Sequence, residues 1–147
     1  MAADRIVEAI SALLAFTGQQ EGDLRTLDEL IGAAVDLPQH PALDQALFGI
    51  FERFPAEDGY GVYWSIVHGL ERRGAYEPAL LASVRRKPVF FNTLMLGRML
   101  NAGIAVCAGT TVRQELEAVA ASTSADPDAR KNADDFLAGS QGRSSAL

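Results

Sequence analysis

The chain has 147 residues, of which 48% are hydrophobic and 22% are charged, and its formal net charge at pH 7 is −6. A chain of this length can bury enough apolar surface to fold as one domain without metals or disulfides, and the single cysteine, Cys107, excludes an internal disulfide. The acidic balance argues against general binding to nucleic acid.

The N-terminal segment MAADRIVEAISALLAF carries acids and a base within its apolar pattern. A signal peptide would instead have a basic region followed by a continuous apolar core, and a membrane span would need a longer apolar run. We therefore expect neither, and we expect a cytoplasmic protein that is not held in a membrane.

Four amphipathic helices are expected in the first half of the chain, because apolar residues recur there at steps of three and four residues. Asp4 and Asp23 can cap the first two helices, Gly18 and Pro38 end them, and Pro55 ends the third. The expected ranges are about 4–16, 23–35, 41–54 and 62–73. The apolar stripes of the first two helices are Ile6, Val7, Ile10, Leu13 and Leu14, and Leu24, Leu27, Leu30, Ile31 and Val35.

The second half of the chain has the signals of four further helices. Pro78 fits only the first turn of a helix over 76–87, and Pro88 opens the next helix, which ends near residue 101. A weaker helical pattern begins near residue 110, and Asp126 can cap a last helix with Pro127 in its first position. The segment GSQGRSSAL at the end is expected to be a frayed tail.

Eight helices of about this length, joined by short turns, predict an all-α fold. Antiparallel helical hairpins are expected to stack as a short HEAT-like α-solenoid or to pack as an irregular bundle. The segment DPDARKNADDFL is similar to the second helix of a HEAT-type repeat. No run alternates with period two and no hairpin signal is visible, so no strand is expected. We predict a single helical domain over residues 1–139 and a flexible tail over 140–147.

Some polar positions are assigned to solvent by the same helical spacing. On the third helix, Asp44, Gln45, Glu52 and Arg53 lie opposite the apolar stripe and are expected to be outside. Phe90 and Leu94 form a second apolar strip on the sixth helix, which is expected to be sandwiched between neighbours.

Charge is distributed unevenly along the chain. Residues 1–71 hold twelve acids and three bases, whereas residues 72–98 hold six bases and one acid. The bases fall at helix ends, where cations favour the negative end of the helix dipole: Arg72 and Arg73, and Arg85, Arg86 and Lys87. An anion site formed by the second group is the alternative.

The sequence offers little for catalysis. His40 and His68 lack any metal-ligand spacing, and the chain has no Walker loop, no dinucleotide-binding glycine motif, no nucleophile elbow and no CxxC pair. We therefore expect no metal, no cofactor and no catalytic residues. The enzyme alternative would use His68 with Glu71 as a proton-transfer pair.

The outer face of the fourth helix carries the strongest signal outside the core. Trp64, His68 and Glu71 fall together there, opposite the apolar residues. One interpretation is that Trp64 packs on the following hairpin; the other is a partner-binding hot spot, for which tryptophan and tyrosine are typical. The predicted partner-binding residues are Glu57, Asp58, Tyr60, Trp64, His68 and Glu71.

The block from residue 51 to residue 103 contains the segments DGYGVYWSIVHGLE, YEPALLASVRRKP and LMLGRMLNAG. It resembles small bacterial immunity proteins of polymorphic or contact-dependent toxin systems. The resemblance implies a non-enzymatic protein that binds a cognate toxin in the producing cell and blocks it.

Two function hypotheses follow. The first is an immunity protein whose partner is a protein toxin. A basic toxin would be met by acidic side chains and an aromatic anchor. The second is a HEAT-like scaffold or regulatory module for protein–protein interaction. In either case we expect a monomer or homodimer when no partner is bound.

Overall fold

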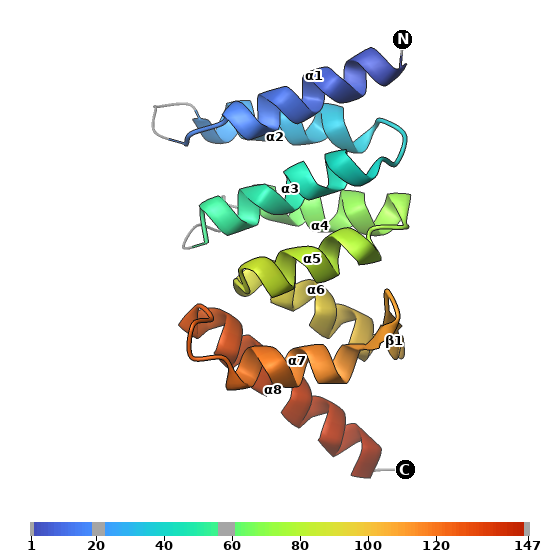
Figure 1. Ribbon diagram of the computed structural model, residues 1–147, viewed down its shortest axis with the longest axis vertical. Helices are drawn as coiled ribbons and strands as arrows, with labels where there is room; N and C mark the ends of the chain where they lie inside the picture. The colour runs from blue at the N-terminus through green and yellow to red at the C-terminus, as the bar shows by residue number, and fades with distance from the viewer. Residues whose placement is uncertain (1, 19–22, 56–60, 146–147) are drawn as a thin grey trace. The chain divides into compact units, whose positions relative to one another are not determined.

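The computed structural model describes residues 2–18, 23–55 and 61–145, and it describes side chains for residues 3–18, 23–55 and 61–140. These residues form eight helices and one short hairpin, so the predicted all-α class is confirmed (Figure 1). The helices are α1 (Ala2–Ala15), α2 (Asp23–Val35), α3 (Pro41–Arg53), α4 (Val62–Arg73), α5 (Glu77–Arg86), α6 (Phe90–Asn101), α7 (Val112–Ala121) and α8 (Pro127–Ser145). No described helix combines the length and the apolar character that crossing a membrane requires.

Most helix ends agree with the local signals in the sequence. The prediction that Asp4 caps the first helix is wrong, because α1 begins at Ala2 and Asp4 lies inside its first turn. Asp126 caps α8 as expected, because its carboxylate accepts a hydrogen bond from the Asp128 backbone N–H at 2.9 Å. The sixth helix begins at Phe90, two residues after Pro88. The last helix continues to Ser145, whereas a tail was expected from about residue 139. That residues 1–139 form a single domain stays a prediction.

The structure contains a β-hairpin, so the prediction of no strand is wrong. Strands β1 (Val106–Cys107) and β2 (Thr110–Thr111) pair antiparallel around a turn whose central residues, Ala108 and Gly109, have φ of 49° and 88°. Two successive residues with positive φ are what a tight two-residue hairpin needs. The usual Asn-Gly signal is replaced here by Ala-Gly, and each strand is only two residues long, so the period-two pattern never appears.

The chain divides into two compact units, residues 1–79 and 80–147. In the first unit, α1 packs beside α3 and α2 beside α4, so the four helices form two layers (Figure 1). Gly69 allows α4 to approach α2 closely, because a Cβ at this position would lie 2.3 Å from a methyl carbon of Val35. The core between the layers includes the fully buried residues Leu13, Leu27, Ile31, Leu43, Leu47, Phe48, Ile50, Ile66 and Leu70.

In the second unit, α6 packs against both α7 and α8. Residues 91–97 of α6 are all buried, which confirms that this helix is sandwiched. Gly97 lies directly under the Phe136 ring of α8, since a Cβ there would be 2.2 Å from that ring. The second apolar strip is divided: Leu94 is buried at 9% exposure, whereas Phe90 is 36% exposed.

Polar residues stabilise two helix junctions that the sequence pattern did not indicate. The buried amide of Asn92 accepts a hydrogen bond from the Val89 N–H and donates to the Ser83 hydroxyl and the Lys87 carbonyl, at 2.9–3.0 Å. This network joins α5 to the start of α6. In the first unit, Arg53 donates to the carbonyls of Leu13, Leu14 and Phe16 at 2.6–3.1 Å, and so caps the C-terminus of α1.

The prediction that Asp44 and Glu52 face solvent is wrong, since their exposures are 1% and 8%. α3 contacts both α1 and α4, so it has less free surface than its own pattern suggests. Asp44 is tolerated there because Arg73 and Gln39 both donate hydrogen bonds to its carboxylate, at 3.2 and 2.9 Å. The Arg73 guanidinium also donates to the Pro38 carbonyl.

Candidate functional site

The predicted site lies on α4, a helix that its sequence makes strongly two-sided. The helix begins after Gly61, which has φ 91°, and ends at Gly74, which has φ 77°. Its inner face buries Tyr63, Ile66, Val67 and Leu70. The outer face carries Trp64 and His68, which are exposed, and Glu71, which is half-buried. The predicted division of this helix into a core face and an outer face is therefore confirmed.

Trp64 and His68 form an aromatic pair on this outer face. Their ring centroids are 5.7 Å apart and the ring planes meet at 40°. The contact follows from their spacing, since residues four apart lie one turn above each other on a helix. Trp64 keeps 37% of its surface exposed, so the neighbouring ring supports the indole without covering it.

Three of the six predicted site residues, Glu57, Asp58 and Tyr60, lie outside the described residues. The described part of the site consists of Trp64, His68 and Glu71, which the structure brings together on one helix face. Their contribution to partner binding stays a prediction.

The first unit, to which this face belongs, is acidic in composition. Residues 1–79 carry thirteen acids and five bases, whereas residues 80–147 carry six acids and eight bases. On α2, which packs beside α4, Asp28, Glu29 and Asp36 are exposed, and Leu24 is 38% exposed. Arg72 at the end of α4 pairs with Asp36 across 3.6 Å, and this exposed pair offsets one of these charges.

The other histidine has a structural role. The Nδ1 atom of His40 accepts a hydrogen bond from the Ala42 backbone N–H at 3.1 Å, and His40 is thus the N-cap of α3. Among the residues that the structure describes, no three His, Cys, Asp or Glu side chains gather closely enough to hold a metal ion. The Cys107 side chain is fully buried.

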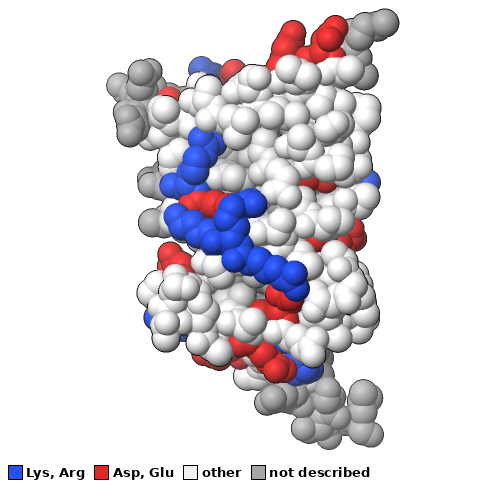
Figure 2. Space-filling model, in the orientation of Figure 1, with Lys and Arg blue, Asp and Glu red and all other residues white. Residues whose placement is uncertain are grey.

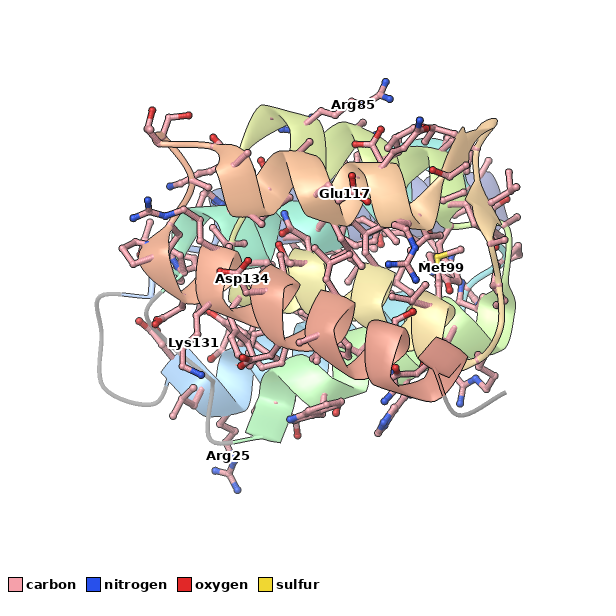
Figure 3. All side chains as sticks on the ribbon, turned by 90° about the horizontal axis from the view of Figure 1, so that it is seen from below. Arg25, Arg85, Met99, Glu117, Lys131 and Asp134 are labelled. Atoms are coloured by element: carbon pink, nitrogen blue, oxygen red, sulfur yellow. The ribbon has the colours of Figure 1, made fainter. Side chains whose placement is uncertain are left out.

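The basic residues near the end of α5 were the alternative site. Arg85 and Arg86 lie in the last turn of this helix, where the dipole favours them, and basic side chains gather over this end (Figure 2). Arg85 projects outward (Figure 3), and its guanidinium contacts the Glu115 carboxylate at 2.6 Å. This hydrogen bond and the negative charge of Glu115 raise the pKa of Arg85.

A cleft of about 370 Å³ lies beside this ion pair, between α5 and α7. Its lining is largely apolar: Val84, Arg85, Pro88, Glu115, Ala118, Val119 and Ser122. Because Glu115 already neutralises the nearest cation, the cleft has no net positive charge at this pair and is a poor anion site. A smaller cleft of about 250 Å³ lies between α6 and α8, next to the Lys131–Asp135 ion pair of 2.9 Å.

Sequence reasoning missed several exposed apolar residues by assigning them to core stripes. Val7 and Leu14 of α1 are 62% and 60% exposed, and Leu24 of α2 is 38% exposed. In α1, apolar residues occupy more than half of the circumference, so the helical spacing alone does not indicate which of them face the core. This excess of apolar residues was the signal in the sequence that some of them face outward.

Searches of protein-family models, of curated proteins and of solved structures found no match to this chain.

Proposed function

We propose that this protein is an immunity protein that binds and neutralises a cognate bacterial protein toxin and has no catalytic activity of its own. The observation that carries the proposal is the Trp64–His68 pair on the outer face of α4, with the indole 37% exposed. An exposed tryptophan held in place by a neighbouring ring costs little conformational entropy when it binds, and tryptophan is enriched among residues that dominate interface affinity.

The charge distribution supports a basic toxin as the partner. The thirteen acids and five bases of residues 1–79 give this unit a negative field, which speeds the approach of a positively charged surface. In this proposal the carboxylates set the association rate and the aromatic anchor slows dissociation. The toxin would meet the protein in the cytoplasm.

Co-expression with the product of the adjacent gene tests the proposal. Expression of that product alone should arrest growth, and co-expression of this protein should restore growth and yield a complex that co-purifies. A neighbouring product that is not toxic, or whose toxicity this protein does not change, would contradict the proposal.

A HEAT-like scaffold that binds peptides is the second candidate, favoured by the regular layering of α1 to α4 (Figure 1). The two functions differ in what a partner does when the protein is removed. A scaffold partner is harmless alone, whereas a toxin is not. The same co-expression experiment therefore separates them.

A further inference from the structure

The outer face of α1 exposes apolar side chains that the fold itself does not cover. α1 packs on α2 and α3 through its inner side, where Leu13 is fully buried. On the adjacent flank, roughly 100–120° around the helix from Leu13, Val7 and Leu14 are 62% and 60% exposed, the highest values among the large hydrophobic residues that the structure describes.

The spacing of this face indicates what would cover it. Ala3, Val7, Ile10 and Leu14 follow one another at steps of four, three and four residues. This is the a/d spacing of a two-stranded coiled-coil seam, in which each apolar side chain inserts between those of a facing helix. Ala3 is exposed and Ile10 half-buried, so the seam is continuous along the helix.

α1 is held firmly enough to present this seam to a partner. Arg53 caps its last turn with three hydrogen bonds of 2.6–3.1 Å to main-chain carbonyls. Next to this cap, the Phe16 and Phe54 rings make an edge-to-face contact at 5.6 Å. The face therefore does not need to form upon binding, which lowers the cost of association.

We propose that a second copy of this chain covers the face, with the two α1 helices packed antiparallel about a two-fold axis. In this arrangement Val7 of one protomer lies opposite Ile10 of the other, and Ala3 lies opposite Leu14. The charges select this orientation. All the charged residues of α1, which are Asp4, Arg5 and Glu8, lie in its first half, and residues 9–18 carry none. Antiparallel packing sets each acidic first turn beside the uncharged half of the other helix, whereas parallel packing would bring four carboxylates together.

The interface is small, since a 14-residue helix spans about 21 Å. Standard protein interfaces bury roughly 1,600 Å², and a single helix pair of this length buries less. The dimer should therefore be weak, with a dissociation constant on the order of micromolar or higher. The face lies on α1 and the Trp64 pair on α4, so this inference stands independently of the proposed toxin binding.

Sedimentation of the full chain over a concentration series from about 1 to 500 µM tests the proposal. The mass should rise from that of one chain toward that of two. Val7→Glu and Leu14→Glu should each keep the protein monomeric at the highest concentration, with an unchanged circular dichroism spectrum. Leu24→Glu, which charges an exposed leucine of α2, is the matched control and should dimerise like the wild type. A wild type that remains monomeric throughout, or a Val7→Glu variant that dimerises as before, would overturn the proposal.

Cross-linking tests the orientation. An equimolar mixture of Val7→Cys and Ile10→Cys proteins should form mainly the mixed disulfide dimer under mild oxidation, and Cys107 should not react because it is fully buried. Disulfides mainly between identical variants would overturn the antiparallel arrangement.

Discussion

The Trp64 and His68 rings lie 5.7 Å apart on the outer face of α4, and the indole remains 37% exposed beside its neighbour. Two consequences follow. The pair offers an oriented apolar surface in the acidic first unit of the chain. Since Trp64 is the only tryptophan, its fluorescence also reports on this one surface.

Acrylamide quenching measures the accessibility of Trp64 directly. In the isolated protein the quencher should reach the indole readily, because more than a third of its surface is exposed. A partner that covers the outer face of α4 should reduce the quenching constant and shift the emission to shorter wavelength. Quenching that does not change in the complex would place the partner elsewhere.

The buried Asp44 carboxylate predicts a specific pH dependence. Burial raises the pKa of Asp44, although the hydrogen bond from Gln39 and the charge of Arg73 act in the opposite direction. The folded protein therefore holds the proton more strongly than the unfolded chain, in which the group titrates near its ordinary value of 3.8. The stability contributed by this group is fully present below that value and is lost as the pH rises through the folded pKa.

Urea denaturation of the wild type and Asp44→Asn between about pH 3 and pH 7 checks this sign. The wild type should lose stability relative to the variant as the pH increases from the lower limit, and the difference should level off above the folded pKa. A wild type that instead gains stability relative to the variant over this range would mean that Arg73 outweighs burial.

Arg53→Ala should destabilise the protein by about 1–2 kcal/mol, because it leaves the last carbonyls of α1 without their donor. Arg25→Ala is the matched control, since Arg25 is exposed and projects outward from α2 (Figure 3). That change should alter the free energy of unfolding by less than about 0.5 kcal/mol. Equal losses in the two variants, measured by denaturant titration, would argue against the cap.

Gly97→Ala and Gly49→Ala should act in opposite directions. A Cβ at Gly97 would lie 2.2 Å from the Phe136 ring, so α6 and α8 must separate, at a cost of about 1–3 kcal/mol. No atom lies within 4 Å of a Cβ built on Gly49 in the middle of α3, so alanine there should stabilise the fold by about 0.5–1 kcal/mol. Thermal unfolding of both variants gives the comparison, and a stable Gly97→Ala protein would contradict the close helix contact.

The helices could be predicted from the sequence because each is specified locally. Pro41, Pro55 and Gly74 delimit α3 and α4, and the apolar spacing between them admits only a helical period. The same locality explains why the outer position of Trp64 was predictable: α4 has one narrow apolar face, and Trp64 lies opposite to it.

Contacts between helices were not predictable in the same way. Asp44 looks like a solvent residue on its own helix, and the hydrogen bonds that it receives from Arg73 of α4 and from Gln39 explain its burial. The outward direction of Val7 and Leu14 likewise depends on where α2 and α3 pack against α1. A helical period gives the faces of one helix, but it does not give the neighbour that each face receives.

Calorimetric titration of the product of the adjacent gene with the wild type, Trp64→Ala and Phe90→Ala tests the central claim most directly. Phe90 is the matched control because its exposure of 36% equals that of Trp64 to within one percentage point. Trp64→Ala should lose about 2 kcal/mol or more of binding free energy, roughly a thirtyfold rise in Kd, while Phe90→Ala should bind within about threefold of the wild type. A folded Trp64→Ala protein that binds as tightly as the wild type would contradict the assignment of this face.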